Sequence, residues 1–360
     1  MHIGPTTDQI NLRDNVREIL AAVCPLTLTR RAYTDSLSWQ HFWKQAVGLG
    51  WTSLARRGFE NNLELGTLDL ILTLESFGAV LAPIPFLSSV GLAAGAARAG
   101  GAAMNTVLSE IDSGSVATLA AQPTYRRFAG APMRFRDKRI QGTALAVPDA
   151  VHADLIVLLC TTGRGVAVAA VRLGDGVTVS PVDSADPSRP LATVTLDAAP
   201  VSIAPVSIRA AIGPATLAVA AELLGVAQGA LDLAVEHARN RRQFDRPIGA
   251  NQAVKHALAD CHVAVERARS LTYLAAARLD SAAPVPDQVW GSCLLAKAAA
   301  GDAALSCART AVQVFGALGQ TWEHDIHLYL RRAWVGAAQF GDSSSLYAQV
   351  GQRFLNGAPQ

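Results

Sequence analysis

The segment Arg239–Gln252 reads RNRRQFDRPIGANQ and places four arginines between two long, alanine-rich apolar segments. Apolar residues three and four positions apart on either side predict one helix over 213–240 and a second over 252–280. The Phe-Asp-Arg-Pro-Ile sequence between them is a short connecting turn. Long helices joined by short connections pack side by side, so this segment predicts the first corner of a helical bundle.

Two further helical segments, over 288–316 and 325–354, complete the predicted bundle. The stretch 210–231 is long and apolar enough to be mistaken for a membrane span. Its residues are mostly small, and it contains the polar residues Glu222 and Gln228. We therefore interpret it as a helix buried between other helices, and we expect no membrane partner.

The chain before the bundle shows two different patterns. Residues 8–120 follow a helical pattern that Pro83 and Pro85 interrupt, and an alanine-rich helix pair is expected over 91–109. The next residues form short stretches rich in Val, Leu and Thr between turn sequences, which is typical of antiparallel strands. We predict a mainly α fold with a central β domain. The predicted domains are an N-terminal helical domain, a small antiparallel β-barrel or sandwich and a C-terminal four-helix bundle, over 1–115, 116–207 and 208–360.

The composition narrows the possible classes of protein. The chain has 360 residues, half of them hydrophobic, and a formal net charge of +2. The hydrophobic content argues against disorder, and the small net charge argues against a nucleic-acid surface. The five cysteines include no CxxC pair, so we expect reduced buried thiols and no metal site. The N-terminus lacks the pattern of a signal peptide, and we expect a cytoplasmic protein.

Four motifs, in order along the chain, resemble those of the acyl-CoA dehydrogenase family. Arg241–Ile248 is similar to the family's R-x-Q-F-G-x-P-I turn, and Gln252–Asp260 to its Q-x-x-x-H-x-L-A-D helix. Gln313–Gly319 is similar to its Q-x-x-G-G-x-G segment, and Tyr329–Ala333 to the Y-x-R-D-A sequence that follows. The stretch LESFGAVLAPIPFLSS at 74–89 resembles the N-terminal helical domain. The resemblance therefore covers nearly the whole chain.

The resemblance implies a site for FAD. Arg241 and Gln243 would hold the pyrophosphate, and Phe244 would lie near the flavin ring or the ribityl chain. An arginine suits this role because its guanidinium makes a two-pronged, charge-assisted contact to phosphate. The remaining contacts to the dinucleotide, including its adenosine half across a subunit interface, would come from Asn251, Gln252, Gln313, Gly316 and Ala317.

A solvated loop that caps a helix is the alternative interpretation of the arginines. It does not explain why the amide, aromatic and proline residues of the turn occur together with the Gln313 motif. We interpret the other arginines, Arg239, Arg242 and Arg246, as surface or interface charges. For His256, a satisfied helix histidine and a functional role stay equally open.

The catalytic base of the family has no clear counterpart here. The α,β-dehydrogenation of an acyl-CoA thioester needs a carboxylate that abstracts the α proton while a hydride passes to the flavin. The usual Glu belongs to a Y-E-G-T segment, and in the matching stretch FGDSSS (340–345) Gly341 stands in its place. Asp342 is a weak candidate, because a misplaced base can cost about 100-fold in rate. The family's other position for the base, near Ala215–Thr216, holds no acid, and Glu222 is two turns further along.

The β domain departs from the family as well. The T-E-x-x-A-G-S-D loop and the W-I-T-N strand, which face the flavin ring in the family, are missing, and AAQPTYRRFAGAP (120–132) lacks their acids and serine. The chain thus resembles the non-catalytic partner subunits of heteromeric actinobacterial acyl-CoA dehydrogenases, some of which act on steroid side chains. This resemblance implies an α2β2 heterotetramer with a catalytic paralogue, an acyl-CoA substrate and electron-transfer flavoprotein as the electron acceptor.

Two other functions stay open from the sequence. One is a self-sufficient homotetrameric dehydrogenase, or a flavin oxidase, that uses Asp342 or another base. The other is a flavin-free pseudoenzyme that binds acyl-CoA. The sequence names neither the acyl group nor the partner.

Overall fold

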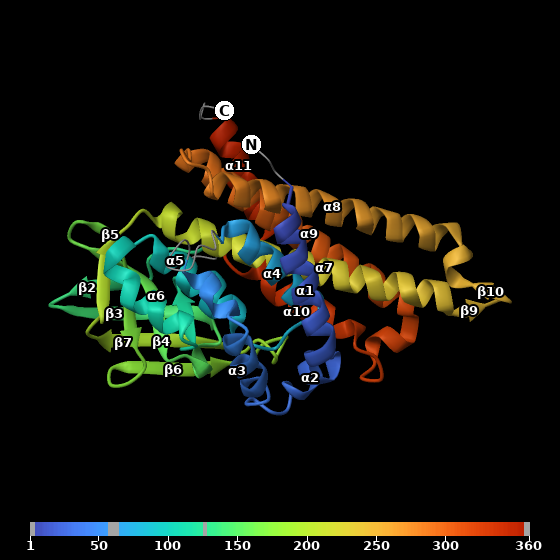
Figure 1. Ribbon diagram of the computed structural model, residues 1–360, viewed down its shortest axis with the longest axis horizontal. Coiled ribbons are helices and arrows are strands. Elements are labelled where there is room, and N and C mark those ends of the chain that lie inside the picture. The colour runs from blue at the N-terminus through green and yellow to red at the C-terminus, as the bar shows by residue number, and fades with distance from the viewer. Residues whose placement is uncertain (1–3, 57–64, 125–127, 356–360) are drawn as a thin grey trace.

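The computed structural model describes residues 4–56, 65–124 and 128–355 (Figure 1). The strands of a β sheet gather at one end of the molecule, three long helices run along its length, and a small hairpin projects at the opposite end (Figure 1). The predicted fold class, mainly α with a central β domain, is confirmed. The long helices are α7 (Ile208–Asn240), α8 (Gln252–Leu279) and α9 (Pro286–Phe315), and the hairpin consists of β9 (Arg242–Gln243) and β10 (Arg246–Pro247).

The N-terminal region consists of short helices that are tied to the bundle. The backbone N–H and the hydroxyl of Thr67, at the start of α4, donate hydrogen bonds to Asp280 at 2.6 and 2.5 Å. Asp280 directly follows the last residue of α8 in the bundle. Its carboxylate therefore caps the N-terminus of α4, a helix of the N-terminal region. The helices are α1 (Thr7–Val23), α2 (Leu26–Arg31), α3 (Gln40–Gly48), α4 (Thr67–Ala79), the π-helix η2 (Leu87–Ala93), α5 (Ala94–Arg98) and α6 (Asn105–Asp112).

The helix pair expected over 91–109 begins earlier and is more broken than predicted. The π-helix η2 continues directly into α5, which ends at Arg98. Gly101 then takes a φ of 59°, a left-handed conformation that ends the helical path before α6.

The central sheet is mixed rather than purely antiparallel. Its strands follow the order β6-β7-β3-β2-β4-β5-β8, with β1 beside β4. β4 pairs in parallel with both β1 and β2, so the antiparallel prediction is wrong for these two pairs. The reason is that β4 joins the sheet only after the chain has passed through β2 and β3. The strands are β1 (Ala117–Ala120), β2 (Met133–Arg136), β3 (Arg139–Pro148), β4 (Leu155–Thr162), β5 (Gly165–Arg172), β6 (Val177–Val182), β7 (Leu191–Ala198) and β8 (Ser202–Pro205).

The last predicted helix, over 325–354, is two helices in the structure. α10 (Ile326–Ala338) and α11 (Ser343–Leu355) are separated by a break at which Phe340 and Gly341 have φ values of 59° and 111°. A right-handed helix cannot continue through left-handed backbone, so the chain changes direction there. This break falls on the segment where the resemblance places a catalytic carboxylate.

The central helix of the molecule is α7, and it approaches α4 unusually closely. A Cβ atom built on Gly225 would lie 1.9 Å from the carbonyl oxygen of Glu75. One built on Gly78 of α4 would lie 2.1 Å from the carbonyl oxygen of Glu222. Glycine at these positions lets the two helix backbones touch.

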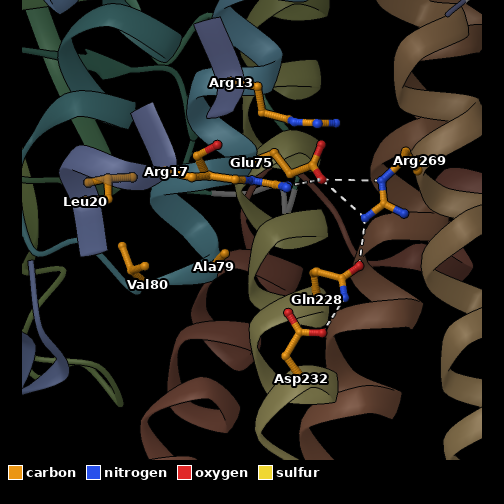
Figure 2. Close-up of a pocket in the computed structure, with 10 residues that line it drawn as sticks. Arg13, Arg17, Leu20, Glu75, Ala79, Val80, Gln228, Asp232 and Arg269 are labelled. Atoms are coloured by element: carbon orange, nitrogen blue, oxygen red, sulfur yellow. Dashed lines mark hydrogen bonds and ion pairs between the residues drawn. The ribbon is translucent and has the colours of Figure 1, made fainter. Parts of the chain in front are cut away.

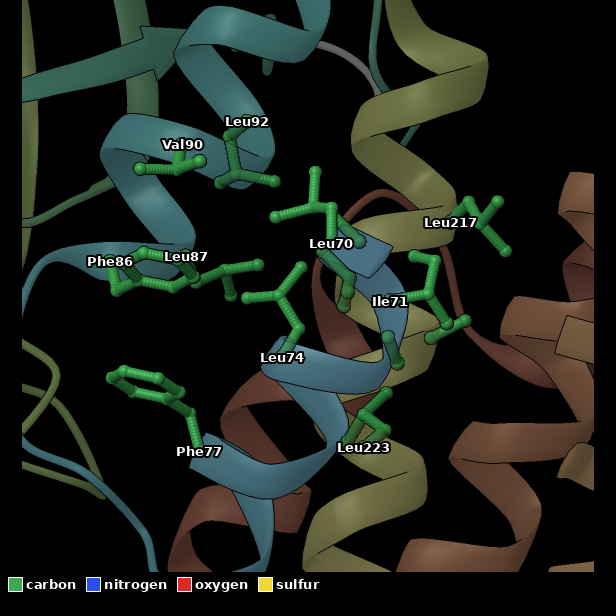
Figure 3. Packing of buried hydrophobic residues seen from close by; sticks show 14 of the residues in the cluster. Leu70, Ile71, Leu74, Phe77, Phe86, Leu87, Val90, Leu92, Leu217 and Leu223 are labelled. Atoms are coloured by element: carbon green, nitrogen blue, oxygen red, sulfur yellow. The ribbon is translucent and has the colours of Figure 1, made fainter. Parts of the chain in front are cut away.

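Around this contact, α4 is packed on its other side by the residues that follow it. Figure 3 shows Leu74 and Phe77 of α4 directed toward Phe86 and Leu87. The rings of Phe77 and Phe86 are stacked, with their centroids 4.6 Å apart. Helix α7 is long and apolar enough to cross a membrane. However, 89% of the residues in its most apolar stretch are buried inside the protein. The interpretation of 210–231 as a buried helix is therefore confirmed.

Candidate functional site

The arginine-rich segment forms a two-stranded hairpin between α7 and α8. Gln243 pairs with Arg246, and the two residues between them, Phe244 and Asp245, have φ values of 52° and 63°. Positive φ at both positions is the geometry of a type I′ turn, whose twist matches that of a hairpin. Phe244 is consequently held at the tip, where it is 94% exposed.

A pocket of about 790 Å³ lies between this hairpin, the beginning of α8 and the end of α9. It is lined by four of the predicted FAD contacts, which come from three separate elements. The side chain of Asn251 also caps α8, because its Oδ1 accepts a hydrogen bond of 3.0 Å from the N–H of Ala253. The structure therefore brings these predicted contacts to one place: Gln243, Phe244, Asn251 and Gln313.

The other predicted contacts do not line this pocket. Arg241 is the C-cap of α7, and its backbone N–H donates to the carbonyl oxygen of His237 at 2.8 Å. Gln252 is the exposed first residue of α8. Gly316 ends α9 with a φ of 63°, and Ala317 follows it on the surface. Their roles in holding FAD stay predictions.

Residues that sequence reasoning did not assign to the site also line the pocket. Arg309 and Thr310 belong to α9, and Arg309 lies one turn before Gln313. Residues four apart share a helix face, so helical spacing could have identified Arg309. Arg246, which we interpreted as a surface or interface charge, lines the pocket opposite Gln243.

A stack of rings packs against the end of α9 on the side of Arg241. The His237 ring stacks on Phe315 with centroids 4.0 Å apart, and the centroid of the tilted His324 ring lies 4.1 Å from that of Phe315. Burial lowers the pKa of His237, and the nearby His324 and Arg241 lower it further. Neutral imidazoles at this position are compatible with packing against an aromatic ring.

At the broken helix junction, none of the described side chains is placed as a free base. Phe340 is buried, and Gly341 lies so close to Phe128 that a Cβ atom would be 2.8 Å from two of its ring carbons. Asp342 caps α11, because its Oδ1 accepts a hydrogen bond of 2.8 Å from the N–H of Ser345. The weak candidate for the base therefore already has a structural role.

A buried lysine of α9 forms hydrogen bonds with the backbone of the same junction. The Nζ of Lys297 in α9 donates to the carbonyl oxygens of Ala337 and Gly341, at 3.0 and 3.3 Å. Burial lowers the pKa of Lys297 to about 7, and the charges of Asp342 and Asp302 oppose that shift. A neutral amine retains two N–H groups, so it can keep both hydrogen bonds.

A second, smaller pocket of about 280 Å³ lies between the sheet and α10. Its lining includes Gln122 from the 120–132 segment, Ala146 of β3 and Gln339 at the broken junction. Nε2 of Gln339 is buried and has no hydrogen-bond partner among the described residues. The pocket thus joins the 120–132 segment to the residue before 340–345, the two segments that depart from the family pattern, and it is much smaller than the hairpin pocket.

Glu222, the acid inside α7, belongs to a buried ion-pair network. Its carboxylate accepts hydrogen bonds from Arg189 and from Arg332, the latter at 3.4 Å. Arg332 also donates to Asp186 and, at 2.9 Å, to Ser188. Both contacts of the Glu222 carboxylate are with guanidinium groups, so Glu222 joins α7, α10 and the loop before β7 rather than offering a base.

A third pocket, of about 520 Å³, lies between α1, α4, α7 and α8 and is lined by three arginines (Figure 2). Two of these arginines form ion pairs with an acid of the same pocket. Arg17 and Arg269 both pair with Glu75, at 3.5 and 3.2 Å, and Arg269 also donates to Gln228 at 2.8 Å. Gln228 in turn donates to Asp232 at 2.7 Å. Two of the three arginines of this pocket therefore share one carboxylate, that of Glu75.

Comparisons with known proteins agree with the motifs. Residues 207–355 match the family model described as acyl-CoA dehydrogenase, C-terminal domain. The acyl-CoA dehydrogenase FadE27 of Mycobacterium tuberculosis (strain ATCC 25618 / H37Rv) is 30% identical over 362 residues, and the alignment covers 94% of each chain. FadE34, an acyl-CoA dehydrogenase of the same organism, is 44% identical over 161 residues. That alignment covers 44% of this chain and only 22% of FadE34.

A solved structure extends the similarity to the whole fold. A chain of the ChsE4-ChsE5 complex from Mycobacterium tuberculosis superposes with a TM-score of 0.87 at 27% sequence identity. The superposition covers 100% of both chains. The helical region, the sheet and the bundle thus occur together in a protein that was crystallised as a complex of two named components.

Proposed function

The chain belongs to the acyl-CoA dehydrogenase family, and we propose that it acts there as a partner subunit that completes the FAD site of a catalytic paralogue. One observation carries the proposal. Four predicted FAD contacts line a single pocket at the hairpin, while the segment of the catalytic base offers only an aspartate that caps a helix.

The residues of the hairpin pocket fit an anionic dinucleotide. The amides of Gln243, Asn251 and Gln313 can donate to and accept from ribose hydroxyls and the edges of adenine. The ring of Phe244 offers an exposed apolar face for stacking at the rim of the pocket. When bound, FAD supplies the hydride acceptor for dehydrogenation, and the role of this chain is to bind and orient it.

The chain's own ring side does not fit a working active site. The contact of Phe128 with Gly341 fills the space in which a side chain at position 341 would begin. Among the described residues that line the small pocket beside Gln339, Asp183 is the one carboxylate. We therefore propose that the acyl-CoA thioester, which the resemblance suggests is derived from a steroid side chain, binds to the catalytic paralogue.

The partners follow from the same proposal. A site that is shared between two chains requires a stable complex, for which we propose an α2β2 heterotetramer in the cytoplasm. The similarity to a chain of the ChsE4-ChsE5 complex supports a complex of two different chains. Electron-transfer flavoprotein would then reoxidise the flavin of the complex, as the family resemblance implies.

Replacing Gln313 with alanine tests this function. If Gln313 contacts FAD bound mainly by a paralogue, Gln313→Ala should raise the dissociation constant of FAD from the complex about tenfold, the effect of one lost hydrogen bond to a polar ligand. The measurement is the flavin fluorescence released on dilution of the purified complex. Gln352→Ala, on the exposed surface of α11, is the matched control. Equal flavin retention in both variants would contradict the proposal.

A further inference from the structure

Two of the five cysteines lie against each other between α8 and α9. Cys261 belongs to α8 and Cys307 to α9, and both are 1% exposed. The Sγ of Cys307 donates a hydrogen bond to the backbone carbonyl oxygen of Cys261 at 3.7 Å, and the two thiols also form a hydrogen bond with each other. Residues 46 positions apart in the sequence thus bring two sulfur atoms together from different helices.

The surroundings of Cys261 favour its thiolate form. Hydrogen bonds from the side chains of Cys307, Thr310 and Ser306 lower the pKa of this thiol. Burial and the charge of Asp260 oppose that shift. The hydrogen bond to Cys261 and burial raise the pKa of the Cys307 thiol. The pair therefore combines a nucleophilic thiolate with a neutral thiol beside it.

The other three cysteines behave in the opposite way. Burial raises the pKa of Cys24, Cys160 and Cys293, to about 12, about 11 and about 12. Each of them is a free, buried thiol. A thiol of this kind packs as a small apolar side chain and reacts slowly, because the thiolate is the reactive form. The five cysteines thus divide into one interacting pair and three inert thiols.

The hairpin pocket offers a route to the pair. Thr310 lines that pocket and is hydrogen-bonded to the Cys261 thiol. Ala257, another lining residue, lies one turn before Cys261 on the same face of α8. The second hydroxyl beside the thiol belongs to Ser306, which is exposed to solvent. A small polar molecule can therefore approach the sulfur of Cys261 past these two hydroxyl groups.

We infer that Cys261 and Cys307 form a peroxide-reactive dithiol, in which Cys261 is oxidised first and Cys307 then closes a reversible disulfide. The inference goes beyond the proposed function, because it needs neither flavin nor a partner chain. The disulfide would fix α8 to α9 beside the hairpin pocket, whose walls these two helices help to form.

The reaction takes place in two balanced steps. The Cys261 thiolate attacks one oxygen of hydrogen peroxide, the O–O bond breaks, and the products are a sulfenic acid and hydroxide, which takes up the proton that the thiol released. The sulfur of Cys307 then attacks the sulfenic sulfur, the S–O bond breaks, and the oxygen leaves as water with the thiol proton of Cys307. Two thiols and one hydrogen peroxide thus give one disulfide and two molecules of water.

Peroxide treatment of the folded, full-length chain tests the inference. The remaining thiols are alkylated under denaturing conditions and counted by mass spectrometry. We expect the loss of two of the five thiols, one peptide pair linked through Cys261 and Cys307, and recovery of both thiols with dithiothreitol. Cys24, Cys160 and Cys293 are internal controls and should stay fully alkylated.

Substitutions separate the roles of the residues. In Cys307→Ser, oxidation should stop at a sulfenic acid on Cys261, which dimedone labels. In Cys261→Ser, Cys307 should stay reduced at the same peroxide concentration. Thr310→Val should slow the oxidation of Cys261 about tenfold, since it removes one hydrogen bond to a charged sulfur. Thr272→Val is the matched control, because the hydroxyl of Thr272 on α8 is buried without a hydrogen-bond partner among the described residues. It should keep the wild-type rate.

Four results would overturn the inference. These are an unchanged thiol count in the folded chain at millimolar peroxide, an equal loss of all five thiols, no dimedone label in a folded Cys307→Ser variant, and equal oxidation rates for Thr310→Val and the wild type. Circular dichroism verifies that each variant is folded. If a serine variant does not fold, the linked peptide pair of the wild-type chain decides the outcome.

Discussion

Replacing Arg332 with methionine is expected to lower the free energy of unfolding by about 3 to 5 kcal/mol. Arg332 is 1% exposed, and its guanidinium donates to Asp186, Glu222 and Ser188. Methionine has a similar length and no charge, so the variant keeps most of the volume but leaves Asp186 buried without its main partner. An uncompensated buried carboxylate costs far more than the ion pair itself contributes.

Urea denaturation followed by circular dichroism measures this effect. Arg331→Met is the matched control, because Arg331 is the preceding residue on α10 and its guanidinium donates only to the carbonyl oxygen of Ala185, at 3.1 Å, among the described residues. We expect that control to lose less than about 1 kcal/mol. Similar losses in the two variants would show that the network of Arg332 does not hold the sheet against the bundle.

Replacing Gly225 with alanine is expected to cost about 3 kcal/mol, although alanine favours a helix. The added Cβ would lie 1.9 Å from the carbonyl oxygen of Glu75 and 2.7 Å from the backbone nitrogen of Ala79. Both are backbone atoms of α4 and cannot rotate away, so α4 and α7 must separate along their contact. The loss of packing outweighs the gain of about 1 kcal/mol in helix propensity.

A second glycine of the same helix provides the control for Gly225. A Cβ atom on Gly213 would meet nothing closer than 3.8 Å, which is ordinary van der Waals contact. Gly213→Ala should therefore leave stability unchanged or raise it by up to about 1 kcal/mol. In thermal unfolding, the expected outcome is a loss of stability for Gly225→Ala and no loss for Gly213→Ala. A loss of similar size at both positions would contradict the role of backbone contact between α4 and α7.

The fold class was readable from the sequence because helices and strands differ in the period of their apolar residues. Strand pairing between segments that are far apart in the sequence could not be predicted in the same way. The parallel pairing of β4 with β1 and β2 is set by the path of the chain, which local alternation does not record. The break at Phe340 and Gly341 was missed because positive φ at Phe340 has no marker in its residue type.

The candidate site was readable only in part, for a related reason. The motifs identified Gln243, Phe244, Asn251 and Gln313, which the structure brings to one pocket. They could not show which arginine of the segment faces that pocket, because this depends on the register of a two-residue turn.

The contact between Phe128 and Gly341 was also invisible in the sequence. This contact joins two segments that are more than 200 residues apart in the sequence. From the sequence, position 341 simply lacked a carboxylate. The structure adds that a side chain there would meet the ring of Phe128, so restoring a glutamate requires that ring to move.

The central claim is that this chain supplies one part of an FAD site and another chain supplies the rest. The most direct measurement is the flavin content, by absorbance, of the chain purified alone and of the chain co-purified with a catalytic acyl-CoA dehydrogenase paralogue. We predict no retained flavin in the chain alone and one FAD for each pair of different chains in the complex. One FAD per chain in the protein purified alone, together with oxidation of an acyl-CoA, would contradict the account and return the search for a base to Asp342.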